Sequence, residues 1–414
     1  EMQQLDIIES LSLPGRSEIE VEVAPSYRSH ELPQIWDELR RRCPVAHSDA
    51  HGGVWLPTTH DDVSAVARDT DSFSSEGVIV SQFKPVGIAP RGYAPPITSD
   101  PPFHATARRI LLPAFAPREI DRWEPATRAS CRQLIDDVIE SGDDVVDAAT
   151  QYAQHIPVRV IAEMLGLPPE DGDRFREFIH RILETPGQGG ADLAPEDTLV
   201  HYLTEVIVRR RREEPRDDLI GFLLEAEMDG EPLSDEHIFG TIALLIIAGI
   251  DTTWSAIGAS LWHLAQHPED RHRMITEPEV RPFALEELLR FYAPVTMARI
   301  VDGDDATVGD REVGDRDWVL LPFPAANRDP EVFERADEFV IDRQRNRHVA
   351  FGLGIHRCIG SNLARMELRV ALEEWLARVP DFELADPDAV RWSTGQVRGP
   401  RTLPLRIHPV TGGN

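Results

Sequence analysis

The sequence predicts one large, mainly helical domain that carries a small β-rich region. Apolar residues recur three and four positions apart through most of residues 102–212, as one face of a helix requires. Residues 234–266 form a single long helical pattern, whereas β-branched runs are short and few. Because the sequence shows no internal repeat and no linker, we expect residues 1–30 to be an N-terminal arm and residues 31–414 to be the domain.

The remaining elements follow from apolar periodicity and from the positions of proline and glycine. The stretch 76–100 holds several prolines between apolar residues, so we expect a long loop that is either functional or mobile. Helices are predicted at 31–43, 61–68, 278–292 and 359–378, and strands at 53–56, 298–301, 306–308 and 319–321.

The longest predicted helix has clear boundaries. Ser234 can cap its first turn, and Pro268 follows its end. At 1.5 Å per residue it spans roughly 50 Å, enough to cross a domain. Its middle, residues 244–250, is apolar all round and should be buried, but Asp251 and Thr252 then interrupt the apolar run.

Charge and cysteine content narrow the class of protein. Lys and Arg number 43 against 72 Asp and Glu, a net charge of −29 that argues against binding to nucleic acid or anionic membranes. The three cysteines do not suggest a disulfide framework, and the N-terminal residues lack the pattern of a signal peptide or anchor. We therefore expect a cytoplasmic protein, and a monomer.

The strongest chemical signal is the run from Phe351 to Gly360, just before a predicted helix. Its three glycines allow tight turns and close approach to a flat ligand. Cys358 stands at the helix N-terminus, where the dipole and free N–H groups stabilise a thiolate. No second ligand stands at zinc-site spacing, so a haem iron is the better match. A buried structural role is the alternative, and we prefer it for Cys43 and Cys131.

The pattern Phe-x-x-Gly-x-x-x-Cys-x-Gly resembles the haem-binding signature of the cytochrome P450 family. Three further motifs occur in the expected order, and the resemblance spans about residues 24–407. It is greatest to the soluble, ferredoxin-dependent bacterial members of the camphor-hydroxylase type, which implies a P450-type helical domain. The residues that carry it are Phe351, Gly354, Cys358 and Gly360, Glu287 to Arg290, Ala248 to Thr252, and Asn327 to Phe333.

The resemblance implies haem b as cofactor, with Cys358 as the axial ligand of the iron. Glu287 and Arg290, three apart on one helix, would form a buried network with an arginine or asparagine of the later irregular segment. A surface ion pair of little energetic value is the alternative. The residues that would bind the propionates are His104, Arg108, Arg299 and His356, and those that would contact the ring or oxygen are Ala248, Gly249, Phe351, Gly352 and Gly360.

Asp251 and Thr252 suit the proton supply that cleavage of the O–O bond requires. A hydroxyl beside the haem can hold an ordered water, and a nearby carboxylate can pass protons inward from solvent. The helix can widen here, since a threonine hydroxyl competes for backbone bonds. The alternative is that Thr252 bonds a backbone carbonyl and Asp251 is merely solvated.

The implied reaction inserts one oxygen atom of O2 into a C–H bond of a small hydrophobic substrate, a terpenoid or an aromatic compound. Electrons would come from NAD(P)H through a reductase and a ferredoxin docked on a basic patch around the cysteine. The alternatives are a peroxide-driven peroxygenase and a haem sensor without turnover. The expected pocket residues are Leu244, Leu245, Ala248, Val295, Met297 and Val397, and the expected patch is Arg343, Arg345, Arg347, His348, Arg357 and Arg365.

Overall fold

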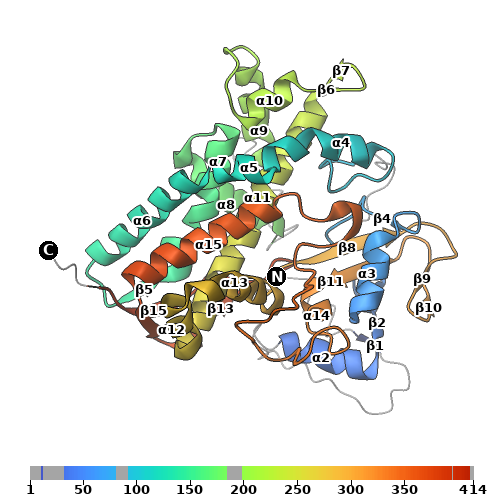
Figure 1. Ribbon diagram of the computed structural model, residues 1–414. Helices are drawn as coiled ribbons and strands as arrows, with labels where there is room; N and C mark the ends of the chain where they lie inside the picture. Colours follow the sequence, from blue (N-terminus) through green and yellow to red (C-terminus); the bar gives the residue numbers. More distant parts are fainter. Residues whose placement is uncertain (1–10, 13–31, 81–91, 184–197, 394, 411–414) are drawn as a thin grey trace.

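The computed structural model describes residues 11–12, 32–80, 92–183, 198–393 and 395–410. Helices dominate, and the largest sheet lies to one side of them, so the predicted fold class is confirmed (Figure 1). The helices are α2 (Leu32–Arg42), α3 (His60–Arg68), α4 (Phe103–Leu111), α5 (Pro117–Asp121), α6 (Glu124–Glu140), α7 (His155–Leu165), α8 (Gly172–Leu183), α9 (Leu199–Arg210), α10 (Leu219–Glu225), α11 (Asp235–Gln266), α12 (Pro268–Thr276), α13 (Arg281–Phe291), α14 (Phe323–Ala326) and α15 (Ser361–Arg378).

The largest sheet has six strands in the order β1-β2-β3-β11-β8-β4, and a three-stranded sheet has the order β12-β15-β5. Of the described strands in the larger sheet, only β3 and β11 pair in parallel. The strands are β1 (Leu11–Ser12), β2 (Val45–Ser48), β3 (Val54–Pro57), β4 (Phe73–Ser74), β5 (Val145–Asp147), β6 (Glu227–Met228), β7 (Glu231–Pro232), β8 (Thr296–Val301), β9 (Thr307–Val308), β10 (Arg311–Glu312), β11 (Trp318–Pro322), β12 (Asp381–Leu384), β13 (Arg391–Trp392), β14 (Pro400–Thr402) and β15 (Pro404–His408).

The expected N-terminal arm lies outside the described residues except for β1, which pairs with β2 at the edge of the large sheet. The part of the proline-rich stretch at 81–91 also lies outside them. Strands β5 and β12 to β15, each two to five residues long, were not among the strands predicted from the sequence.

The large sheet is covered on both faces. Along β11, Trp318 and Leu320 join a cluster with Trp36 of α2, whereas Val319 and Leu321 join a second cluster on the side of α3. This alternation is the period of two that a strand imposes on its side chains. Both faces of the sheet are thus buried, which gives β8 a rigid position.

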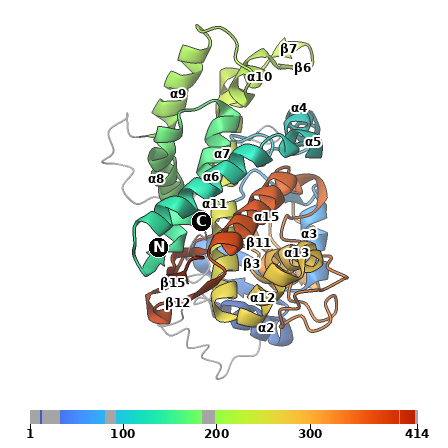
Figure 2. The same cartoon turned by 60° about the vertical axis from the view of Figure 1, so that its left-hand side comes forward.

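The long predicted helix is α11, and its observed start and end match the sequence signals. The Ser234 hydroxyl accepts from the His237 N–H at 3.2 Å, and the helix stops at Gln266, before Pro268. It runs through the helical part of the molecule and packs against α7 and α15 (Figure 2). Among the described residues it is the one helix long and apolar enough to cross a membrane, and 56% of that apolar window is buried in the protein core.

The last part of the proline-rich stretch, as far as the structure describes it, is attached to α11. The Thr241 hydroxyl donates to the Pro95 carbonyl at 3.2 Å. Next to it, a Cβ at Gly240 would lie 2.3 Å from the Tyr93 carbonyl oxygen, so only glycine permits this close approach. The contact holds the loop against the N-terminal part of α11.

Candidate functional site

A cavity opens between the middle of α11, strand β8 and the loop before α15. The five predicted substrate-pocket residues Leu244, Leu245, Ala248, Val295 and Met297 line it. Val397, the sixth residue predicted for the pocket, is buried and forms a β-bridge with the cavity-lining Val295, but does not itself line the cavity. Other predicted site residues that line the cavity are Arg108, Gly249, Thr252, Arg299, Phe351, Gly352, His356, Cys358 and Gly360.

The loop before α15 turns tightly to present Cys358. Gly352 and Gly354 adopt positive φ angles of 67° and 64°, a region that side chains disfavour. A Cβ at Gly354 would also lie 2.7 Å from the Ala67 carbonyl oxygen of α3. The Cys358 N–H donates to the Phe351 carbonyl at 2.8 Å, which closes the loop on itself.

The Cys358 side chain is exposed because it opens into the cavity. Desolvation raises the pKa of its thiol, while the Gly360 N–H and the nearby Arg108, Arg357 and Arg365 act in the opposite direction. All four groups favour a negatively charged sulfur. The thiol is therefore placed to become a thiolate when a cation binds in front of it.

Two histidines meet at the edge of the cavity. The rings of His104 and His356 lie 4.4 Å apart, and the His356 Nε2 lies 2.8 Å from the Ser75 hydroxyl. The His104 Nε2 is buried and has no hydrogen-bond partner among the described residues. Burial lowers the pKa of His104 to about 4 and that of His356 to about 2, with Arg108 and Arg299 adding to these shifts.

Two arginines, Arg108 and Arg299, complete this cluster and are its cationic members. Arg299 is 5% exposed, and its guanidinium donates to the adjacent Ala298 carbonyl at 2.7 Å. Burial lowers the pKa of Arg299 to about 10. Arg108 donates to the Arg357 carbonyl at 2.5 Å. Neither arginine forms an ion pair with a described carboxylate, so both can bind an anion from outside the chain.

This cluster fits haem b. A flat macrocycle with two carboxylates would meet apolar walls, one thiol and a set of buried donors that face the same space. Such carboxylates would hydrogen-bond to the His104 Nε2, which has no partner among the described residues. They would also pair with Arg299, which bonds only to a backbone carbonyl among these residues. The predicted propionate-binding set is thus brought together, although its four members come from α4, β8 and the cysteine loop.

Thr252 and Asp251 face different surroundings. The Thr252 hydroxyl lines the cavity and donates to the Ala248 carbonyl at 2.9 Å. Asp251 is buried away from the cavity and pairs with Arg401 of β14 at 2.7 Å, so it is not solvated. The expected widening of the helix is absent, since α11 is α-helical throughout.

The Arg290 guanidinium donates two buried hydrogen bonds to the Glu287 carboxylate, each 2.8 Å long. Glu287 also accepts from Arg343 at 3.0 Å and from Asn346 at 3.1 Å. Arg290 donates to the Asn327 carbonyl at 2.8 Å. The structure therefore contains the expected network with the irregular segment that leads to the cysteine loop.

The expected basic patch is smaller than predicted. Arg343 is buried in the Glu287 network, and His348 and Arg365 bind Glu286 at 2.8 Å and 2.6 Å. The positive charges of Arg343 and Arg365 are thus compensated by carboxylates far away in sequence, and the His348 ring contacts the same Glu286. The residues that remain exposed are Arg345, Arg347 and Arg357.

Two ionisable residues in or beside the site were not predicted from the sequence. Glu367 of α15 lines the cavity at 1% exposure, and desolvation raises its pKa to about 8. Its signal was present, because it stands among apolar residues on the buried face of a predicted helix. Arg401, the partner of Asp251, had no local signal, since the strand that carries it is three residues long.

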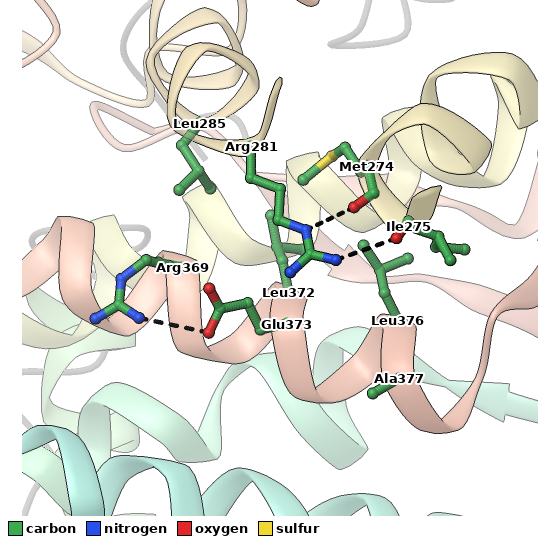
Figure 3. A pocket seen from close by; sticks show the side chains of 9 residues that line it. All are labelled: Met274, Ile275, Arg281, Leu285, Arg369, Leu372, Glu373, Leu376 and Ala377. Atoms are coloured by element: carbon green, nitrogen blue, oxygen red, sulfur yellow. Dashed lines mark hydrogen bonds and ion pairs between the residues drawn. The ribbon is translucent and has the colours of Figure 1, made fainter. Parts of the chain in front are cut away.

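A second pocket lies between α12, α13 and α15 and contains none of the predicted site residues (Figure 3). Its polar groups are engaged within the protein. Arg281 donates to the carbonyls of Met274 and Ile275 at 2.7 Å and 3.2 Å, and Arg369 pairs with Glu373 at 3.4 Å. The Arg281 contacts join α13 to α12, whereas the Arg369–Glu373 pair lies within α15, and both have a structural role.

Known proteins resemble this chain along almost its full length. The sequence model of the family described as "Cytochrome P450" matches residues 53–389. The "Mycinamicin IV hydroxylase/epoxidase" of Micromonospora griseorubida is 32% identical over 89% of this chain and 94% of its own length. The structure of cytochrome P450 CYP109Q5 from Chondromyces apiculatus superimposes with a TM-score of 0.80 at 35% identity, covering 92% of this chain and 96% of that one. The structure of CYP109E1 from Bacillus megaterium in complex with testosterone gives 0.80 at 31%, covering 90% and 97%.

Proposed function

The chain belongs to the cytochrome P450 family, whose members are monooxygenases that bind haem b through a thiolate, and from this premise we propose that Cys358 is the axial ligand. The observation that carries the proposal is the position of this sulfur. It opens into the cavity at the N-terminus of α15, close to Arg108, Arg357 and Arg365. Cys43 and Cys131 are buried and line no part of the cavity.

We propose that the haem carboxylates bind to His104, Arg108, Arg299 and His356. Haem b, when bound, supplies the iron at which dioxygen is bound and activated. The two arginines would pair with the carboxylates and the two histidine rings would hydrogen-bond to them, which anchors and orients the macrocycle. Phe351, Gly352 and Gly360 shape the thiolate side, and Ala248 and Gly249 leave room on the side of α11.

Thr252 and Asp251 are proposed to manage the protons that the reduction of dioxygen consumes. The Thr252 hydroxyl donates to Ala248 in this structure and can turn to donate into the cavity, where it would hold a water or pass a proton. The Asp251 carboxylate, one residue earlier on the helix, would replace that proton. Apolar walls keep bulk water away from this transfer.

We propose that the substrate is a small hydrophobic molecule, a terpenoid or an aromatic compound, hydroxylated at a C–H bond. Four apolar side chains support this, since Leu244, Leu245, Val295 and Met297 line the cavity. Among the relatives, one is named for mycinamicin IV and another was crystallised with testosterone, a hydrophobic steroid. These relatives favour a carbon skeleton with few charges.

Electrons are proposed to come from an acidic ferredoxin that docks by the exposed Arg345, Arg347 and Arg357, with the protein acting as a cytoplasmic monomer. These arginines stand close to Cys358 in sequence. On a chain of net charge −29 they form a local positively charged region, which would orient a negatively charged partner toward the thiolate side.

The test is a Cys358→His variant with Cys43→Ala as control. If Cys358 is the ligand, its replacement removes the thiolate-type absorption spectrum of the reduced carbonyl complex, because histidine supplies a neutral nitrogen in place of sulfur. Cys43→Ala should keep that spectrum. A thiolate-type spectrum in the Cys358→His protein refutes the assignment.

A further inference from the structure

The Asp251 carboxylate is held by a residue from the far end of the chain. Arg401 of β14 binds it at 2.7 Å, and the Asp251 side chain is only 1% exposed against 14% for that of Arg401. Thr252 follows at once in sequence but lines the cavity, which Asp251 does not. Adjacent residues on a helix point about 100° apart, so the ion pair and the cavity lie on different sides of α11.

Arg401 itself is confined by two more contacts with α11. Its guanidinium donates to the Ser255 hydroxyl at 3.0 Å and lies 4.3 Å from the centre of the Trp254 ring. Asp251, Trp254 and Ser255 stand at positions i, i+3 and i+4, so all three share the face of the helix that meets Arg401. A guanidinium fixed by a carboxylate, a hydroxyl and an aromatic face has little freedom to rotate.

The backbone of the same segment presses against α11. A Cβ at Gly399 would lie 2.3 Å from the Ser255 Cβ, and one at Gly258 would lie 3.3 Å from Pro400. The position of Arg401 is therefore set by backbone contact in the residues that lead to it. A buried carboxylate stays ionised only when a cation of this kind remains beside it.

We propose that Arg401 is a positioning residue for proton delivery, which holds the Asp251 carboxylate on the β14 side of α11 and sets the rate at which it serves Thr252. The inference rests on the proposed role of the Asp251–Thr252 pair. In each transfer the carboxylate takes one proton from the solvent side and gives one to the Thr252 side, so it is regenerated unchanged. Arg401 acts only through Asp251 and touches no reacting atom.

A kinetic double-mutant cycle tests this on the haem-loaded protein, with NADPH, a ferredoxin reductase, a ferredoxin and 7-ethoxycoumarin as probe. Arg401→Met should slow oxygen uptake by at least about tenfold, in the range of a lost proton-transfer group, and increase the ratio of rates in H2O and D2O. Arg401→Lys, which keeps the charge, should stay within about twofold. The control is Arg406→Ala on β15, whose side chain is 43% exposed and 4.0 Å from Glu383, and it should match the wild type.

The decisive comparison is Asp251→Asn against Asp251→Asn/Arg401→Met. The inference predicts equal rates and equal isotope ratios, because Arg401 has nothing left to position. This comparison also serves if Arg401→Met alone fails to fold, since the double variant buries no uncompensated charge. A further loss in the double variant overturns the inference. If instead Asp251→Asn turns over normally, the proposed proton role of the pair fails as well.

Unfolding by urea supplies a readout that is independent of activity. For a direct pair, the changes in the unfolding equilibrium constant should be non-additive by at least about fivefold across the four proteins. The double variant should be more stable than the sum of the single losses predicts. Additive losses would show that the two side chains do not interact in solution, and the inference would be lost.

Discussion

At the scale of single residues, the Thr252 hydroxyl has two competing partners. In the structure it donates to the Ala248 carbonyl at 2.9 Å, while its side chain also faces the cavity. Thr252→Ala should therefore leave electron consumption intact and divert it to hydrogen peroxide, because protons no longer reach the correct oxygen. We expect product per electron to fall by at least about tenfold, measured as product and peroxide per NADPH.

A matched control for this variant is Ser260→Ala. Ser260 also lies on α11 and donates to a carbonyl four residues earlier, Ala256, at 2.7 Å, but it does not line the cavity. Its removal should leave the yield of product unchanged. Equal peroxide release from both variants would show that backbone bonding, and not proton delivery, is the role of Thr252.

Glu367 predicts a pH dependence of stability. Its pKa is raised to about 8 in the folded protein, so the side chain is neutral at pH 7, whereas the unfolded chain releases the proton near the ordinary value of 4.5. The stability that Glu367 contributes to the folded protein is present in full below pH 4.5 and is lost as the pH rises through 8. Across this window Glu367→Gln should gain roughly 3–5 kcal/mol relative to the wild type, measured by urea unfolding at several pH values.

Glu383→Gln is the control for that experiment, because the Glu383 side chain is 66% exposed on β12. Its stability should follow the wild type at every pH. Parallel curves for Glu367→Gln and the wild type between pH 5 and 9 would mean that Glu367 is not held neutral inside the fold.

At the scale of elements, the contact between β14 and α11 connects the C-terminal strands to the site. A Cβ at Gly399 would lie 2.4 Å from the Ser255 Cα, so Gly399→Ala must push the two backbones apart. We expect a loss of roughly 1–3 kcal/mol in the free energy of unfolding, typical of overpacking, together with slower turnover as Arg401 moves. Urea unfolding and oxygen uptake measure the two effects.

Gly142→Ala is the control for Gly399→Ala, because it strains the backbone without displacing a neighbouring element. Gly142 has a φ of +74°, and a Cβ at this position would meet no atom within 4 Å, so its substitution costs only about 1 kcal/mol of local strain. Turnover of Gly142→Ala should equal that of the wild type. Gly399→Ala with unchanged stability would show that the strand can shift freely, against a tight contact between β14 and α11.

At the scale of the whole molecule, the charge distribution bears on partner choice. Arg345, Arg347 and Arg357 are exposed on a chain of net charge −29, while Arg343 is buried and pairs with Glu287. Replacing the three exposed arginines by glutamine should lower the rate of reduction by an acidic ferredoxin about tenfold at low salt. The salt dependence of that rate should largely disappear, as stopped-flow reduction at several ionic strengths would record.

The exposed Arg391 on β13 is a control of like charge, and Arg391→Gln should keep both the rate and its salt dependence. If the triple variant is reduced as fast as the wild type at every ionic strength, the electron donor docks elsewhere.

The sequence by itself determined the elements and chemistry that are local. Ser234 and Pro268 bound α11, the glycines shape the loop around Cys358, and Glu287 meets Arg290 one helical turn away, since each feature depends on residues a few positions apart. Only the tertiary structure decided what distant segments do to one another. In the folded protein Asp251 pairs with Arg401, Arg343 pairs with Glu287, and Val397 pairs with Val295 outside the cavity lining. Charge pairing and burial of this kind depend on which surfaces meet in space.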